Sequence, residues 1–180
     1  MSEQPPPLRR VVTGHDAAGY SLIEQDGPPP GMVSVPERPG YVMANVWRTG
    51  AMPSSVLAPD DIDQHRGVLP PKGGTVIRVI DIPPEPADPA TLHAMLHATF
   101  RRLYPDADHA PKAGGHQGMH RTTTVDYAIV LFGSITAIMD EGETVLNAGD
   151  ILIQRGTNHA WANRSGAVCR ICFVLIDGKA

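Results

Sequence analysis

The sequence has few of the features that mark membrane or nucleic-acid-binding proteins. No apolar stretch approaches the roughly 20 residues that cross a bilayer, and the opening residues, MSEQPPPLRR, lack the apolar segment of a secretory signal. Basic residues never run longer than the pairs Arg9-Arg10 and Arg101-Arg102, and the formal charge of -4 argues against a basic face for phosphate groups. We therefore expect a cytoplasmic protein whose partner is a small-molecule substrate, with no nucleic acid and no membrane.

Cysteine is also scarce. The two that are present, Cys169 and Cys172, form a C-x-x-C within VCRICFVLI, a run with strong β propensity. Residues three apart on a strand face opposite sides. A redox C-x-x-C normally opens a helix, and the sequence has no second cysteine pair to complete a zinc site. We interpret both residues as structural thiols in a strand.

Glycine and proline are abundant, with 18 of each in 180 residues. This composition favours many short strands joined by tight turns, and the length fits one domain. We expect a disordered tail over residues 1–8 and a single domain over 9–180, divided into an N-terminal extension (9–110) and a barrel core (111–177). Strands are predicted within residues 10–24, 41–48, 74–82, 125–132, 134–139, 143–146, 150–154 and 168–176. The Pro-rich stretch 25–40 is predicted to be a loop.

One helix is predicted over residues 89–104. Asp88 is a natural N-cap, Pro89 occupies the first helical position and Pro105 marks the end. His93 and His97 are four residues apart, a spacing that zinc proteases use. The residue after His93 is alanine instead of the general-base glutamate of that motif, so we interpret these two histidines as solvated.

The stretch GGHQGMHRTTTVDYAIVLFG, residues 114–133, places histidines in a run that otherwise predicts sheet. His120 and Asp126 from this stretch, with His159 from GDILIQRGTNHAWAN, would make a 2-His-1-carboxylate set that leaves metal positions open for substrate or dioxygen. Such ligands suit Fe, Zn, Mn or Ni alike, so we expect one divalent metal ion without choosing its identity. The alternative is a metal-free, hydrogen-bonded polar cluster that lines a pocket.

Together the two stretches resemble the paired motifs of the cupin superfamily, in particular single-domain members with a cupin-2-like conserved barrel. The first family motif reads G-x5-H-x-H-x3-4-E-x6-G and the second G-x5-P-x-G-x2-H-x3-N. Fifteen residues separate Gly133 from Gly149, as in compact microbial cupins. This sequence departs from the motifs at Thr122, Asp126 and Arg155, where the family has histidine, glutamate and proline. The resemblance implies an all-β, double-stranded β-helix (a jelly-roll cupin barrel) with an N-terminal strand extension, one short helix and a divalent metal inside.

The resemblance carries His120 to the first ligand histidine of the family and His159 to the last. His116 lies four residues before His120, so on an extended strand it leans the same way. It is a candidate for the vacant ligand position or, failing that, for a general acid or base. We expect Thr122 to donate a hydrogen bond to the site or to the substrate.

Four further residues are candidates for the substrate pocket. Trp161 lies two residues beyond His159 and is a candidate wall of the pocket, with ordinary core as the alternative. Gln117 is a weaker candidate. Arg155 and Arg48 could hold a substrate carboxylate through a bidentate pair, although a surface role is the alternative for both.

Three functional hypotheses follow. The first is a metal-dependent lyase or isomerase, of the decarboxylase or dehydratase type, acting on a small oxygenated organic acid by Lewis-acid catalysis. The second is a non-haem Fe(II) dioxygenase. The third is a non-catalytic small-molecule-binding module, which the departures at Thr122 and Asp126 favour. From the family resemblance we also expect a homodimer formed through the strand-like residues 9–24 and 41–48.

Overall fold

Most of the chain folds into antiparallel strands, as the short apolar runs predict. The computed structural model describes residues 4–109, 111 and 114–179. The strands are β1 (Arg10–His15), β2 (Ser21–Gly27), β3 (Val33–Val35), β4 (Arg38–Thr49), β5 (Thr75–Ile82), β6 (Thr124–Phe132), β7 (Ser134–Met139), β8 (Glu143–Asn147), β9 (Ile151–Arg155), β10 (His159–Ala162) and β11 (Cys169–Asp177).

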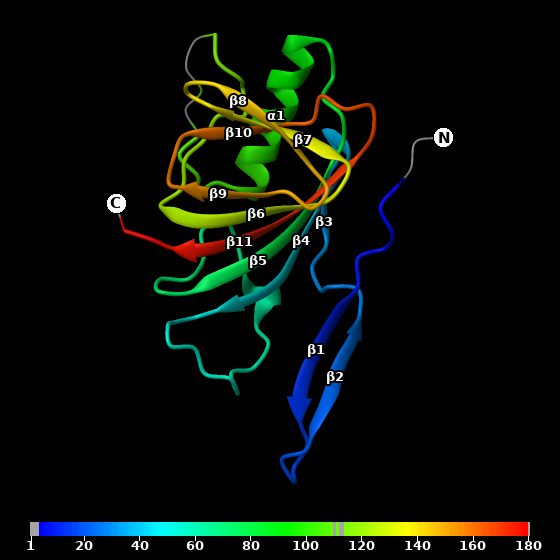
Figure 1. The fold of residues 1–180 in the computed structure, drawn as a ribbon, viewed down its shortest axis with the longest axis vertical. Helices are drawn as coiled ribbons and strands as arrows, with labels where there is room; N and C mark the ends of the chain where they lie inside the picture. Colours follow the sequence, from blue (N-terminus) through cyan, green and yellow to red (C-terminus); the bar gives the residue numbers. More distant parts are fainter. Residues whose placement is uncertain (1–3, 110, 112–113, 180) are drawn as a thin grey trace.

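Two sheets enclose the core. A six-stranded sheet has the order β3-β4-β5-β11-β6-β9 and a three-stranded sheet the order β10-β7-β8 (Figure 1). One hydrophobic cluster joins them, because Ile135 of β7 and Leu146 of β8 belong to the same group of buried side chains as Val130, Ile171 and Phe173 of the larger sheet. The fold is the expected double-stranded β-helix.

The central strand β11 shows how the sequence specifies this packing. It pairs with β5 on one side and with β6 on the other. Alternate residues Cys169, Ile171, Phe173 and Leu175 are buried, as the period of two along a strand requires. Both cysteines are free thiols, and Cys172 is only partly buried. Their assignment as structural thiols in a strand is confirmed.

The helix α1 (Pro89–Leu103) forms where it is predicted. The Asp88 side chain caps it by accepting a hydrogen bond from the Thr91 N–H at 2.8 Å. Its inner face buries Met95, Leu96, Thr99, Phe100 and Leu103. The imidazoles of His93 and His97 stack on the exposed face, with ring centroids 6.2 Å apart. No helix in the described residues is long and apolar enough to cross a membrane.

The N-terminal segment stands apart from the two sheets. Strands β1 and β2 pair only with each other among the described strands and project from the body as a hairpin (Figure 1). This hairpin exposes Val11, Leu22 and Ile23, and the homodimer expected through these strands stays a prediction. Residues 1–3 of the expected tail lie outside the described residues, whereas the Pro6 carbonyl accepts a hydrogen bond from Arg170 at 2.5 Å.

Three short elements were not predicted. Strand β3 lies in the stretch expected to be a loop, where its pairing with β4 outweighs the neighbouring prolines. Strand β10 has only four residues and pairs with β7. A single 3-10 turn, η1 (Ile62–Gln64), lies in the polar connection between β4 and β5. None of these has enough residues for a periodic pattern to be recognised.

Asn163 stabilises the connection between β10 and β11 through hydrogen bonds. Its fully buried amide donates to the carbonyls of Ile82 and Ala167 at 2.7 and 2.8 Å, and its oxygen accepts from Ser165. Because Asn163→Ala removes two buried hydrogen bonds and leaves the Ala167 carbonyl only the Ser165 hydroxyl as donor, we expect it to lower the free energy of unfolding by about 2–3 kcal/mol in urea denaturation. The control Asn158→Ala, which removes an exposed bond to Asp140, should change it by no more than about 0.5 kcal/mol. Equal stability of the two variants would contradict this role.

Candidate functional site

Two histidines from separate parts of the chain lie side by side. His120 and His159 form an isolated antiparallel bridge in which each N–H donates to the other's carbonyl at 2.9 Å. Residues directly opposite each other across such a bridge project to the same side. The two imidazole centroids are therefore only 4.3 Å apart, at an interplanar angle of 48°. The backbone alone brings the two rings together.

Neighbouring carbonyls orient both rings. The Nδ1 atom of His120 lies 2.9 Å from the Gly118 carbonyl, and that of His159 lies 3.0 Å from the Thr157 carbonyl. A carbonyl can only accept, so each Nδ1 carries the proton and each Nε2 keeps a free lone pair. Metal-binding histidines are commonly oriented in this way.

Burial keeps both imidazoles neutral. It lowers the pKa of His120 to about 3, with a further lowering by His159, and it also lowers the pKa of His159. Neither ring carries a charge at neutral pH. Both Nε2 lone pairs are therefore available without competition from a proton.

Gln154 of β9 supports the second ring. Its buried amide lies 3.0 Å from the Nδ1 of His159, and its Oε1 has no hydrogen-bond partner when Nε2 faces the ring. With the amide turned over, the His159 N–H is shared between Oε1 and the Thr157 carbonyl, and the buried oxygen gains its donor. Gln154 thus fixes the orientation and tautomer of His159.

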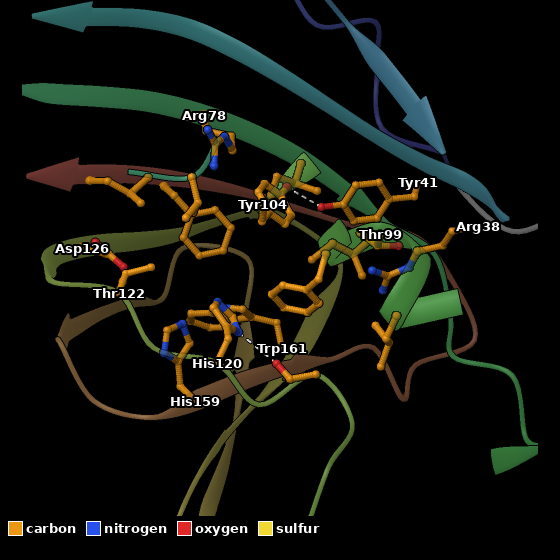
Figure 2. A pocket seen from close by; sticks show the side chains of 18 residues that line it. Arg38, Tyr41, Arg78, Thr99, Tyr104, His120, Thr122, Asp126, His159 and Trp161 are labelled. Atoms are coloured by element: carbon orange, nitrogen blue, oxygen red, sulfur yellow. Dashed lines mark hydrogen bonds between the residues drawn. The ribbon is translucent and has the colours of Figure 1, made fainter. Parts of the chain in front are cut away.

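The two rings open into a largely apolar cavity of about 80 Å³ (Figure 2). Trp161 forms part of the wall, with edge contacts to His159 (centroids 5.6 Å apart) and to Phe173 (5.2 Å). Phe100 of α1 lies 4.9 Å from the His120 ring. The aromatic side chains that surround the imidazoles suit a substrate with an apolar body. Polar lining residues are Arg38, Tyr41, Arg78, Thr99, Tyr104, Thr122 and Asp126.

Asp126 of β6 is the one carboxylate among the residues that line this cavity. The residue is 4% exposed, and its Oδ1 has no hydrogen-bond partner. Burial raises its pKa to about 6, against the opposing effects of a hydrogen bond with Thr124 and the positive charge of Arg78. Such a group can gain or lose a proton near neutral pH.

The expected three-ligand set is not assembled. In residues 4–109, 111 and 114–179, no three side chains among histidine, cysteine, aspartate and glutamate lie close enough together to hold a metal ion. His120 and His159 meet, while Asp126 lines the same cavity without joining them. Thr122 also lines it, and its hydroxyl is hydrogen-bonded to that of Thr124 at 2.7 Å. The donor set present for a metal ion is therefore two imidazoles.

The structure places His116 away from the cavity. A turn closed by the Met119 N–H on the His116 carbonyl (3.1 Å) replaces the extended strand on which its expected orientation depended. The His116 Nδ1 accepts from the Gly118 N–H at 3.1 Å, and Nε2 donates to Glu85 at 3.0 Å. His116 is not among the residues that line the cavity and both its nitrogens are hydrogen-bonded elsewhere, which corrects the expectation that it is a ligand or a general acid or base there.

Three other candidates also lie elsewhere. The Gln117 side chain is hydrogen-bonded to His93 of α1 at 2.8 Å. The Arg48 guanidinium donates a hydrogen bond to the Asp61 carboxylate at 2.8 Å, and the two side chains form an ion pair. Arg155 is exposed on β9 and lines a second depression, at the surface, together with Lys179. None of the three lines the cavity, so the expectation that Arg155 or Arg48 holds a substrate there is corrected.

Several lining residues were missed because they come from the N-terminal extension. Arg38 and Tyr41 of β4 and Arg78 of β5 all line the cavity. The Tyr41 hydroxyl is hydrogen-bonded to that of Tyr104 at 2.6 Å. In the sequence, only the predicted strands at 41–48 and 74–82 indicated inward-facing positions. A strand pattern does not distinguish a residue in a cavity wall from one in the packed core.

Comparison with known proteins agrees with this architecture. Phomopsin biosynthesis cluster proteins C' and D of Diaporthe leptostromiformis are each 31% identical over 197 residues, covering 99% of this chain and 85% of the relative. The cupin-domain-containing oxidoreductase virC of Hypocrea virens is 28% identical over 186 residues, covering 97% of this chain and 79% of the relative. This chain belongs to the cupin superfamily. The resemblance of its two motifs to those of cupins is confirmed.

Two further comparisons add little to this cupin assignment. No protein-family model matches the chain. Among solved structures, a protein with a double-stranded β-helix domain from Klebsiella pneumoniae has a TM-score of 0.45 and 15% identity, covering 81% of this chain and 84% of that chain. The family assignment rests on the sequence relatives.

The pKa of Asp126 gives a test of the cavity. Because the folded pKa is about 6 and that of an unfolded chain about 3.9, the protonated carboxyl contributes about 3 kcal/mol of stability below pH 4, which is lost as the pH rises through 6. In metal-stripped protein, the stability of the wild type relative to Asp126→Asn should therefore fall between pH 4 and pH 7, as measured by urea unfolding. A difference that does not vary with pH would show that Asp126 is not buried as described.

Proposed function

We propose that this cupin is a metal-dependent enzyme that acts on a small, largely apolar organic acid. Its reaction would be of the lyase or isomerase type, and one divalent ion would be held by His120 and His159. The observation that carries the proposal is the pair of neutral imidazoles, with ring centroids 4.3 Å apart and free Nε2 lone pairs, in one largely apolar cavity.

The donor chemistry supports a first-row divalent ion. Neutral imidazole suits Zn, Fe, Mn or Ni, and two protein ligands leave the remaining positions to water or to substrate oxygens. When bound, such an ion supplies Lewis acidity that stabilises negative charge on a substrate oxygen.

Asp126 would carry the proton in this reaction. Its unpartnered Oδ1 and its pKa of about 6 suit a group that removes a proton from the substrate or returns one. Thr122, hydrogen-bonded to Thr124 in the same wall, would donate a hydrogen bond to the substrate. Trp161 and Phe173 would exclude water around the reacting atoms.

The names of the relatives favour a second candidate, an oxidoreductase. Several relatives are named cupin-domain-containing oxidoreductases, including fogC of Aspergillus ruber at 27% identity. Others are named as proteins of phomopsin or oryzines biosynthesis clusters. With iron at the two histidines, the same cavity would support dioxygen-dependent oxidation of a biosynthetic intermediate.

Metal content tests the proposed ligands directly. Protein purified without added metal and then titrated with Zn(II), Fe(II), Mn(II) or Ni(II) should bind one ion per chain, measured by elemental analysis after desalting. His120→Ala and His159→Ala should each lose the bound ion because one imidazole alone is a poor site. His97→Ala, which removes an exposed helix histidine, is the matched control and should keep it. Equal metal content in all three variants would reject the site.

A substrate screen separates the two reaction classes. We expect the metal-loaded protein to convert at least one member of a panel of small hydroxy- and keto-acids with aromatic or branched bodies, followed by mass spectrometry, and to do so under nitrogen as well as in air. Asp126→Asn should slow this turnover by about 100-fold or more. Turnover that requires dioxygen and Fe(II), and is absent with Zn(II) or Mn(II), would reject the lyase in favour of the oxidoreductase.

A further inference from the structure

The four buried arginines among the described residues fall into two kinds. Arg10 and Arg170 each have a carboxylate partner, Asp60 at 2.8 Å and Asp81 at 2.6 Å. The other two line the cavity and have no ion pair within the part of the chain that the structure describes: Arg38 and Arg78. A buried guanidinium without an anion is costly unless other groups compensate it.

Arg78 is compensated by neutral acceptors. Its Nε donates to Asn45 at 2.8 Å and one terminal nitrogen donates to the Gly67 carbonyl at 2.7 Å. Arg38 has no such partners in the part of the chain that the structure describes. It is 5% exposed, its Nε is a buried donor without an acceptor, and its guanidinium lies over the Tyr41 ring at 4.5 Å. The negative charge of Glu85 acts on Arg38, but the Glu85 carboxylate is beyond ion-pair distance and is hydrogen-bonded to His116.

Two buried side-chain atoms in the wall of this cavity lack a hydrogen-bond partner among the described residues: Arg38 Nε and Asp126 Oδ1. Buried donors are normally satisfied, so an unpartnered one in a cavity wall is a position at which a ligand can supply the acceptor. In Figure 2 Arg38 lies at the end of the cavity near Tyr41 and Thr99, well separated from His159 and Asp126.

We propose that Arg38 is the anchor for the anionic group of the substrate, a carboxylate or an acidic enol. A planar carboxylate accepts two parallel hydrogen bonds from a guanidinium and would supply both the absent charge and the absent acceptor. With the acid group held at Arg38, the apolar body would lie along Phe100 and Trp161, and the opposite end of the molecule would reach the histidines. This inference deepens the proposed function, since it names the part of the substrate that is recognised.

Titration calorimetry of EDTA-treated protein with benzoate and with the neutral benzamide tests the anchor apart from the metal. Wild type should bind benzoate about ten-fold more tightly than benzamide or better, because a charged hydrogen-bonded pair is worth about one factor of ten. Arg38→Gln should bind the two equally. Arg48→Gln, which removes an arginine already paired with Asp61 at the surface, should keep the preference.

A benzoate preference that persists in Arg38→Gln, or that is absent from wild type, would overturn the proposal. If circular dichroism shows that Arg38→Gln does not fold, Arg38→Lys replaces it in the test, because lysine keeps the positive charge but lacks the planar guanidinium. The preference of Arg38→Lys for benzoate over benzamide should be smaller than that of wild type. An unchanged preference would count against Arg38 as the anchor. A benzoate site that depends on Arg38 in protein without any metal affinity would sustain this inference while the proposed metal site fails.

Discussion

The site depends on one backbone interaction, the reciprocal pair of hydrogen bonds between His120 and His159. This bridge brings two imidazoles from separate segments to a centroid separation of 4.3 Å. The carbonyls of Gly118 and Thr157 then fix the tautomers, and burial keeps the rings neutral. Without the bridge, neither the tautomers nor the low pKa values would create a shared binding position.

Under the proposed function, the remaining polar groups of the cavity have separate roles in handling a small acid. Asp126 provides a carboxyl with a pKa of about 6, and Arg38 provides a positive charge without an ion-pair partner among the described residues. Both are costly in an apolar interior, and both lie in the wall of the same cavity as the paired imidazoles. The concentration of unsatisfied polar atoms at one place contrasts with the fully paired Arg170 and Asp81 elsewhere in the core.

Much of the fold follows from local patterns. The alternation in β11 and the capping signals of α1 need no tertiary information, so these elements were predicted correctly. The meeting of His120 and His159 was also anticipated, because both lie within the two cupin-like motifs. His116 was misjudged because a turn at 116–119 replaces the assumed strand. Arg38 was missed because its segment lacks a periodic pattern, and its place in the cavity is decided only by the pairing of β4 with β3 and β5.

X-ray absorption spectroscopy of the zinc-loaded protein tests the central claim most directly, because it counts the imidazole nitrogens bound to the ion. The account predicts two imidazoles per zinc, coordinated through the Nε2 atoms that the bridge leaves free. A spectrum with one imidazole or none, or with two that persist in the His159→Ala variant, would contradict it.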